Sequence, residues 1–126
     1  MPISQESWKM CPVLGVRDVG AASDAFENRL GFSVATELEG VYAIARRGGA
    51  EIHLQIRRRL LWTGPREGIE NDVYIRVDDV DAVHADLVRR GAEILRAPAD
   101  QEYGMRDFIV AAPEGYRLSF GAPLAR

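Results

Sequence analysis

The sequence has 126 residues, of which 47% are hydrophobic and 28% charged, and its net charge is −3 at pH 7. This length fits one domain with its own core, and the composition is that of an ordinary globular protein. The uncharged runs are too short to cross a membrane, and scattered basic residues in an acidic chain argue against a nucleic-acid partner. The polar N-terminus has no secretory signal and the single cysteine, Cys11, cannot form an internal disulfide, so we expect a cytoplasmic protein.

The first half of the chain predicts one strand, one helix and three further strands. A β-type run covers residues 13–16. Asp18 then stands at the position of a helix N-cap, before apolar residues at helical spacing, and Gly31 follows the last of them. Three more β-type runs, separated by glycines, occupy residues 32–36, 41–45 and 50–56.

The second half repeats this order. Val77-Asp78-Asp79-Val80 echoes Val16-Arg17-Asp18-Val19, about half the chain further on. We therefore predict one α+β domain, residues 1–126, built from two βαβββ modules at about 10–58 and 72–122, with residues 59–71 as the linker. The strands of the second module are expected at residues 73–77, 93–95, 108–111 and 117–120, and its helix is expected between Asp79 and Gly91.

Three strands alternate between apolar and polar residues, which places the two kinds on opposite faces of a sheet. In residues 50–56 the polar face carries Glu51, His53 and Gln55. The corresponding faces carry Asp72, Tyr74 and Arg76 in residues 72–77, and Arg117 and Ser119 in the last strand. These faces either meet solvent, as in any half-buried sheet, or line a cavity.

Three segments, taken in order, resemble the glyoxalase/bleomycin-resistance/extradiol dioxygenase superfamily. They are the opening at residues 12–19 with Phe26 and Leu30-Gly31-Phe32, the central residues 77–81, and the ending at residues 103–108 and 112–120. The ending is similar to that of the bleomycin-resistance-like branch. The resemblance implies that the curved mixed sheets of the two modules enclose a cavity for a small-molecule ligand, and that the protein is a homodimer whose modules pair within one chain or between two.

Metal-using members of this superfamily place their ligands on the first and last strands of the modules. By this resemblance those positions fall on Cys11, His53, Asp72 and Ser119. Only His53 and Asp72 are good nitrogen or oxygen donors, while a serine hydroxyl is a weak ligand and a thiolate prefers softer metals. Glu51 shares the face of His53 without occupying the family position. We therefore expect no cofactor, with a divalent metal as the alternative.

Three functions remain open. The first is a metal-free protein that binds a small molecule such as an antibiotic. The second is a metal-dependent lyase, isomerase or dioxygenase, in which His53 is the candidate catalytic base beside Asp72. The third is a structural or regulatory dimer with a vestigial cavity, which no ligand would stabilise.

The expected ligand-binding residues combine charge, hydrogen bonding and flat aromatic surfaces. Arg76 and Arg117 either bind an anionic group of the ligand or pair with Glu51 and Asp72. Arg106 either contacts the ligand or forms a salt bridge that fixes its turn. The whole set is His53, Gln55, Trp62, Asp72, Tyr74, Arg76, Tyr103, Arg106, Phe108, Arg117 and Ser119.

Overall fold

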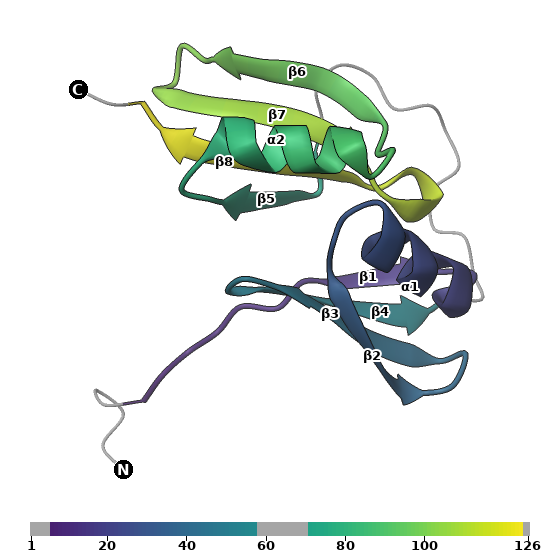
Figure 1. Cartoon of the computed structure of the whole chain (residues 1–126). Helices are drawn as coiled ribbons and strands as arrows, with labels where there is room; N and C mark the ends of the chain where they lie inside the picture. Colours follow the sequence, from purple (N-terminus) through teal and green to yellow (C-terminus); the bar gives the residue numbers. More distant parts are fainter. Residues whose placement is uncertain (1–5, 58–70, 125–126) are drawn as a thin grey trace.

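A computed structural model describes residues 6–57 and 71–124, and these residues form two βαβββ modules (Figure 1). The predicted α+β class and the repeated module are thereby confirmed. Trp62 and nearly all of the expected linker lie outside the described residues. The first module has β1 (Val13–Val16), α1 (Val19–Asn28), β2 (Ser33–Leu38), β3 (Tyr42–Arg47) and β4 (Ala50–Ile56). The second has β5 (Val73–Arg76), α2 (Val80–Arg89), β6 (Ile94–Asp100), β7 (Met105–Ala111), a 3-10 turn η2 (Pro113–Gly115) and β8 (Arg117–Pro123).

The two helices begin at the predicted aspartates. The side chain of Asp18 accepts a hydrogen bond from the backbone N–H of Ala21 at 2.9 Å, and Asp79 accepts one from Ala82 at 3.0 Å. Gly31 and Gly91 follow the helices with φ of 74° and 82°, a conformation that favours glycine. Both helices have ten residues, and neither is long and apolar enough to span a membrane.

Three strands of the second module are longer than expected. The structure begins β7 at Met105 and ends β8 at Pro123, where the sequence predicts strands at residues 108–111 and 117–120. The sequence predicts a strand at residues 93–95, yet β6 continues through Pro98 to Asp100. Proline lacks the backbone N–H that a central strand needs, but β6 lies at the edge of its sheet, where this donor is dispensable.

The strands form two separate four-stranded sheets. Sheet A has the order β1-β4-β3-β2 and sheet B the order β5-β8-β7-β6. The pairs β1–β4 and β5–β8 are parallel, and the other pairs are antiparallel. The outer strands, β1 and β2 in sheet A and β5 and β6 in sheet B, pair on one side only, so each sheet has two free edges.

The modules share one apolar core. Each helix packs on its own sheet, and the fully buried side chains of Phe26, Leu54, Leu87 and Leu118 belong to a single cluster that spans both modules. The turn η2 adds polar contacts between the modules.

Glu114 on η2 joins the second module to the start of α1. Its carboxylate accepts hydrogen bonds from the backbone N–H groups of Arg17 at 2.8 Å and Asp18 at 3.1 Å. The hydroxyl of Tyr116 donates to the carbonyl of Gly15 at 2.8 Å. The segment that resembles the family ending therefore holds the two modules together.

Candidate functional site

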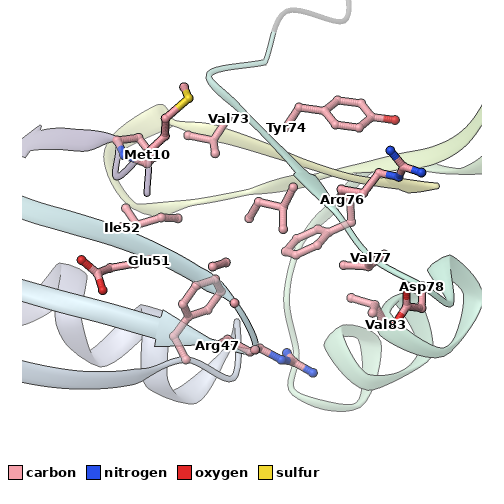
Figure 2. A pocket seen from close by; sticks show the side chains of 17 residues that line it. Met10, Arg47, Glu51, Ile52, Val73, Tyr74, Arg76, Val77, Asp78 and Val83 are labelled. Atoms are coloured by element: carbon pink, nitrogen blue, oxygen red, sulfur yellow. The ribbon is translucent and has the colours of Figure 1, made fainter. Parts of the chain in front are cut away.

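A cavity of about 560 Å³ lies between the modules (Figure 2). Ile52, Val73, Ile75, Val83 and Phe120 supply apolar wall, and residues 73–78 all line it. Consecutive residues of β5 reach the cavity because this edge strand has no neighbour on one side. In Figure 2 the side chains of Tyr74 and Arg76 leave β5 on the side opposite to Val73.

Glu51 connects the cavity to a hydrogen-bonded cluster on the open face of sheet A, the face turned away from α1. Its carboxylate is bound by His53 Nε2 at 2.8 Å, Cys11 Sγ at 3.1 Å and Arg46 Nε at 2.9 Å. A carboxylate can only accept, so Nε2 of His53 carries the proton. Nδ1 of a neutral His53 then accepts the hydrogen bond from the Tyr42 hydroxyl, at 2.6 Å.

These contacts set the ionisation of the cluster. The hydrogen bonds from His53, Cys11 and Arg46 hold the pKa of Glu51 well below its ordinary value. The hydrogen bond to the same carboxylate raises the pKa of the Cys11 thiol, with burial adding to the effect. At neutral pH the cluster therefore contains an ionised Glu51 and a protonated, weakly nucleophilic Cys11.

The four family metal positions do not form one donor set in this chain. Cys11, Glu51 and His53 have their donor atoms within 4.8 Å of one another on module 1. Asp72 precedes β5 and Ser119 lies on β8, so both belong to sheet B; Asp72 Oδ2 accepts the backbone N–H of Arg117 at 2.9 Å, and Ser119 is fully buried. Among the described residues the donor cluster that contains His53 does not include Asp72, so the four positions do not form the metal site that the resemblance implies.

The open face of sheet B carries a second cluster, centred on the fully buried Asp107. Its carboxylate accepts hydrogen bonds from the hydroxyls of Tyr74 at 2.8 Å and Tyr103 at 2.6 Å, and it pairs with Arg96. Burial, followed by the bond to Asp107, raises the pKa of Tyr74. Within the described residues, Arg96 Nε and Ser119 Oγ are buried side-chain atoms without a hydrogen-bond partner.

Sequence reasoning missed Tyr42, Arg96 and Asp107. The sequence does contain a signal for Asp107. It directly precedes the apolar run Phe-Ile-Val-Ala, and an acid that enters a buried strand needs a partner there. Tyr42 and Arg96 gave none, since exposed strands often carry such residues.

Two expected ligand-binding residues lie on the helix-covered side of sheet B. Phe108 is fully buried against His84 and Phe120, with ring centroids 5.2 and 5.4 Å away. Its ring therefore belongs to the core and offers no surface to a ligand on the open face, contrary to expectation. Arg106 pairs with Asp81 at 2.9 Å and Asp100 at 3.0 Å, which is the salt-bridge alternative.

The other expected residues are divided between the sites. Tyr74 and Arg76 line the cavity, and Tyr74 meets Tyr103 at Asp107. Gln55 is exposed on β4 next to Tyr42. Glu51 pairs with Lys9 and Arg46, not with the arginines of the second module as one alternative held.

Comparison with known proteins gives one family and a common fold. The model of the Glyoxalase/Bleomycin resistance protein/Dioxygenase superfamily matches residues 11–120. By sequence, no curated protein matches the chain significantly.

Three solved structures illustrate the similarity. TioX from Micromonospora sp. ML1 is 21% identical with a TM-score of 0.73, over 94% of this chain and 100% of that one. The bleomycin-binding protein from Streptomyces verticillus, solved with copper(II)-bleomycin, is 23% identical with a TM-score of 0.73, over 94% and 98%. Lactoylglutathione lyase from Agrobacterium tumefaciens is 18% identical with a TM-score of 0.67, over 94% and 95%. At these identities the structures establish a shared fold.

Proposed function

The chain belongs to the Glyoxalase/Bleomycin resistance protein/Dioxygenase superfamily, and we propose that it is a cytoplasmic small-molecule binding protein of the bleomycin-resistance-like branch. The observation that carries the proposal is the cavity of about 560 Å³ with its apolar wall and few charged groups. Ligand sites in proteins have this size and this composition. That a protein of the same fold binds copper(II)-bleomycin supports an antibiotic or a comparable, partly aromatic molecule as ligand.

Binding is proposed to need no metal. A metal at Cys11, Glu51 and His53 would have to remove the thiol proton, and the pKa of that thiol is raised. It would also compete with Lys9 and Arg46 for the Glu51 carboxylate. Both requirements lower metal affinity at neutral pH.

The protein is further proposed to be a homodimer in which the free edge of β1 contributes to the interface. Unpaired strand edges favour association with another strand. Val13 on β1, which is 50% exposed, supports this edge as part of the interface. Light scattering after gel filtration tests this, and a monomer at micromolar concentration would contradict it.

A matched pair of variants tests the binding function. Ala50→Phe fills the cavity, whereas Ala35→Phe makes the same change at an exposed position of β2 outside it. A screen of partly aromatic antibiotics by thermal shift should find ligands that stabilise the wild type and Ala35→Phe but not Ala50→Phe. If every stabilising ligand acts equally on Ala50→Phe, the cavity is not the binding site.

A metal-dependent lyase, isomerase or dioxygenase is the second candidate, favoured by the proximity of Cys11, Glu51 and His53. Metal analysis of protein purified without added metal or chelator separates the two functions. The binding function predicts substoichiometric metal in the wild type. Stoichiometric metal that is lost in His53→Ala and kept in the control His84→Ala would instead establish a metalloprotein.

A further inference from the structure

We propose that the ligand of the cavity carries an anionic group, a carboxylate or a phosphate, on an apolar body, and that Arg76 binds this group. The inference rests on the proposed binding function and adds the chemical class of the ligand. It follows from the distribution of charge around the cavity, from the ion pairs of its charged side chains and from its apolar wall.

The charged side chains that line the cavity balance, with two cations and two carboxylates, and the surplus of positive charge comes from residues of the ion-pair clusters behind them. Four charged side chains line the cavity, and their ion-pair partners form two clusters around Glu51 and Asp86. Together the lining residues and these clusters contain six cations and three carboxylates, a surplus of three positive charges in a chain of net charge −3. Such a local surplus attracts anions to a cleft with low-dielectric walls. The cations are Lys9, Arg46, Arg47, Arg76, Arg89 and Arg90, and the carboxylates are Glu51, Asp78 and Asp86.

Three guanidinium groups compete for one carboxylate at one end of the cavity. Asp86 pairs with Arg47 at 2.8 Å, Arg90 at 2.9 Å and Arg89 at 3.1 Å. Arg47 is held further by a hydrogen bond of 2.7 Å to the carbonyl of Leu30. This cluster contributes to the positive potential around the cavity. Arg47 is its one residue that lines the cavity, and it is already bound to Asp86 and to the carbonyl of Leu30.

Arg76 is differently placed. Among the charged residues that line the cavity, Arg47 and Glu51 are held by ion pairs, whereas Arg76 has no ion pair with any described residue. Its side chain is exposed on the edge strand β5. A planar guanidinium with all its donors available binds a carboxylate or a phosphate with two parallel hydrogen bonds. Arg76 can therefore bind an anion without first losing a partner.

The apolar residues that line the cavity determine the chemistry of the rest of the ligand. The apolar lining side chains that are partly exposed, Val73 and Ile75 on β5 and Val83 on α2, favour an apolar body. Asp78 is the one lining carboxylate without an ion pair in the described residues, and it weakens the attraction for an anion. Removing the charge of Arg76 should therefore weaken the binding of an anionic ligand, whereas removing the charge of Asp78 should strengthen it.

Two fluorescent dyes with the same ring system test the inference. Anilinonaphthalene sulfonate and phenylnaphthylamine differ by the sulfonate, which stands for the anionic group of the ligand. The wild type should bind the sulfonate dye about fivefold more tightly, because one partly exposed ion pair contributes at most about 1 kcal/mol. Octanoate and octyl phosphate should displace the sulfonate dye, with the tighter of the two identifying the preferred anion, and octanol should displace it less.

Four variants assign the effect to Arg76. Arg76→Gln should remove the preference for the sulfonate dye, and Arg76→Lys should keep part of it. Asp78→Asn should strengthen binding of the sulfonate dye by about twofold to fivefold. Arg29→Gln makes the same change in net charge at an exposed residue that does not line the cavity, and it should keep the wild-type preference.

The outcomes separate this inference from the binding function. Equal affinity of the wild type for both dyes, with binding abolished in Ala50→Phe, would leave the binding function standing and overturn the inference. A preference for the sulfonate that survives in Arg76→Gln would also overturn it. Binding of neither dye would overturn the cavity as a ligand site and the inference with it.

Discussion

Alanine at position 121 should displace the ring of Tyr74 from Asp107. Gly121 is buried on β8 directly opposite Asp107 on β7, and the ring of Tyr74 lies over it. A Cβ atom at this position would lie 1.9 Å from the Tyr74 hydroxyl oxygen and 2.6 Å from its Cζ. These distances are far too short, so one group must move. Because Tyr74 is 42% exposed, its ring can turn outward without moving the backbone.

The magnitude of the effect follows from the hydrogen bond that is lost. A hydrogen bond to an ionised carboxylate contributes about 1.5–3 kcal/mol. Asp107 keeps its contacts with Arg96 and Tyr103, so its charge remains paired. Gly121→Ala should therefore destabilise the fold by about 2 kcal/mol, which lowers the melting temperature by roughly 7 °C in a domain of this size.

A double-mutant cycle tests this reasoning, with urea unfolding followed by circular dichroism. In the background Tyr74→Ala the ring is absent, and the nearest remaining atom is Asp107 Cβ at 3.0 Å. The remaining approach to Asp107 still requires a small shift, but Gly121→Ala should then cost at least about 1 kcal/mol less than in the wild type. Gly20→Ala is the control, since its Cβ would meet only Asp18 Oδ1 at 3.5 Å. An equal cost of Gly121→Ala in both backgrounds would refute the displacement.

Three further predictions concern ionised side chains, and urea unfolding measures each. Asp107→Asn leaves the charge of the partly exposed Arg96 unpaired and should cost about 2–4 kcal/mol; a cost below 1 kcal/mol would contradict the importance of this pair. Glu114→Gly removes the bonds to the N-terminus of α1, about 1.5–3 kcal/mol, but relieves the φ of 58°, which costs a non-glycine residue about 1–2 kcal/mol. The variant should be less stable by about 1 kcal/mol, and a more stable variant would show that strain dominates. For Glu51, whose pKa is lowered in the folded state, the stabilisation is present above its ordinary pKa of about 4.3 and is lost as the pH falls through the lower folded value. The difference in stability between the wild type and Glu51→Gln should therefore shrink between pH 5 and about pH 2, and a constant difference would contradict the assigned contacts.

The fold could be predicted because its signals are local. An N-cap aspartate, apolar residues at helical spacing and a following glycine fix each helix within about thirteen residues, at Asp18 to Gly31 and at Asp79 to Gly91. Alternation fixes the faces of β4, whose Ile52 and Leu54 are buried beside α1. These features depend on neighbours in the sequence and need no knowledge of the tertiary structure.

The clusters could not be predicted because their members come from distant strands. Asp107, Arg96, Tyr74 and Tyr103 meet only once β5, β6 and β7 have their positions in sheet B. The face of Phe108 was equally undetermined, since residues 108–111 are all apolar and have no alternation to show which side is covered by α2.

The two modules have the same order of elements but do not offer the same face to a ligand. On sheet A the hydrogen-bonded chain from Tyr42 through His53 to Glu51 is only partly buried, and Glu51 reaches the cavity. On sheet B the side chains of Tyr74 and Arg96 lie on Asp107, which is completely covered. A ligand on the open faces therefore meets titratable groups on module 1. On module 2 the proposed contribution comes from β5, where Tyr74 would supply an aromatic ring and Arg76 a cation that has no ion pair among the described residues. This asymmetry agrees with the position of the Cys11, Glu51 and His53 cluster on module 1 alone among the described residues, and the proposed role of Arg76 would assign recognition of charge to β5.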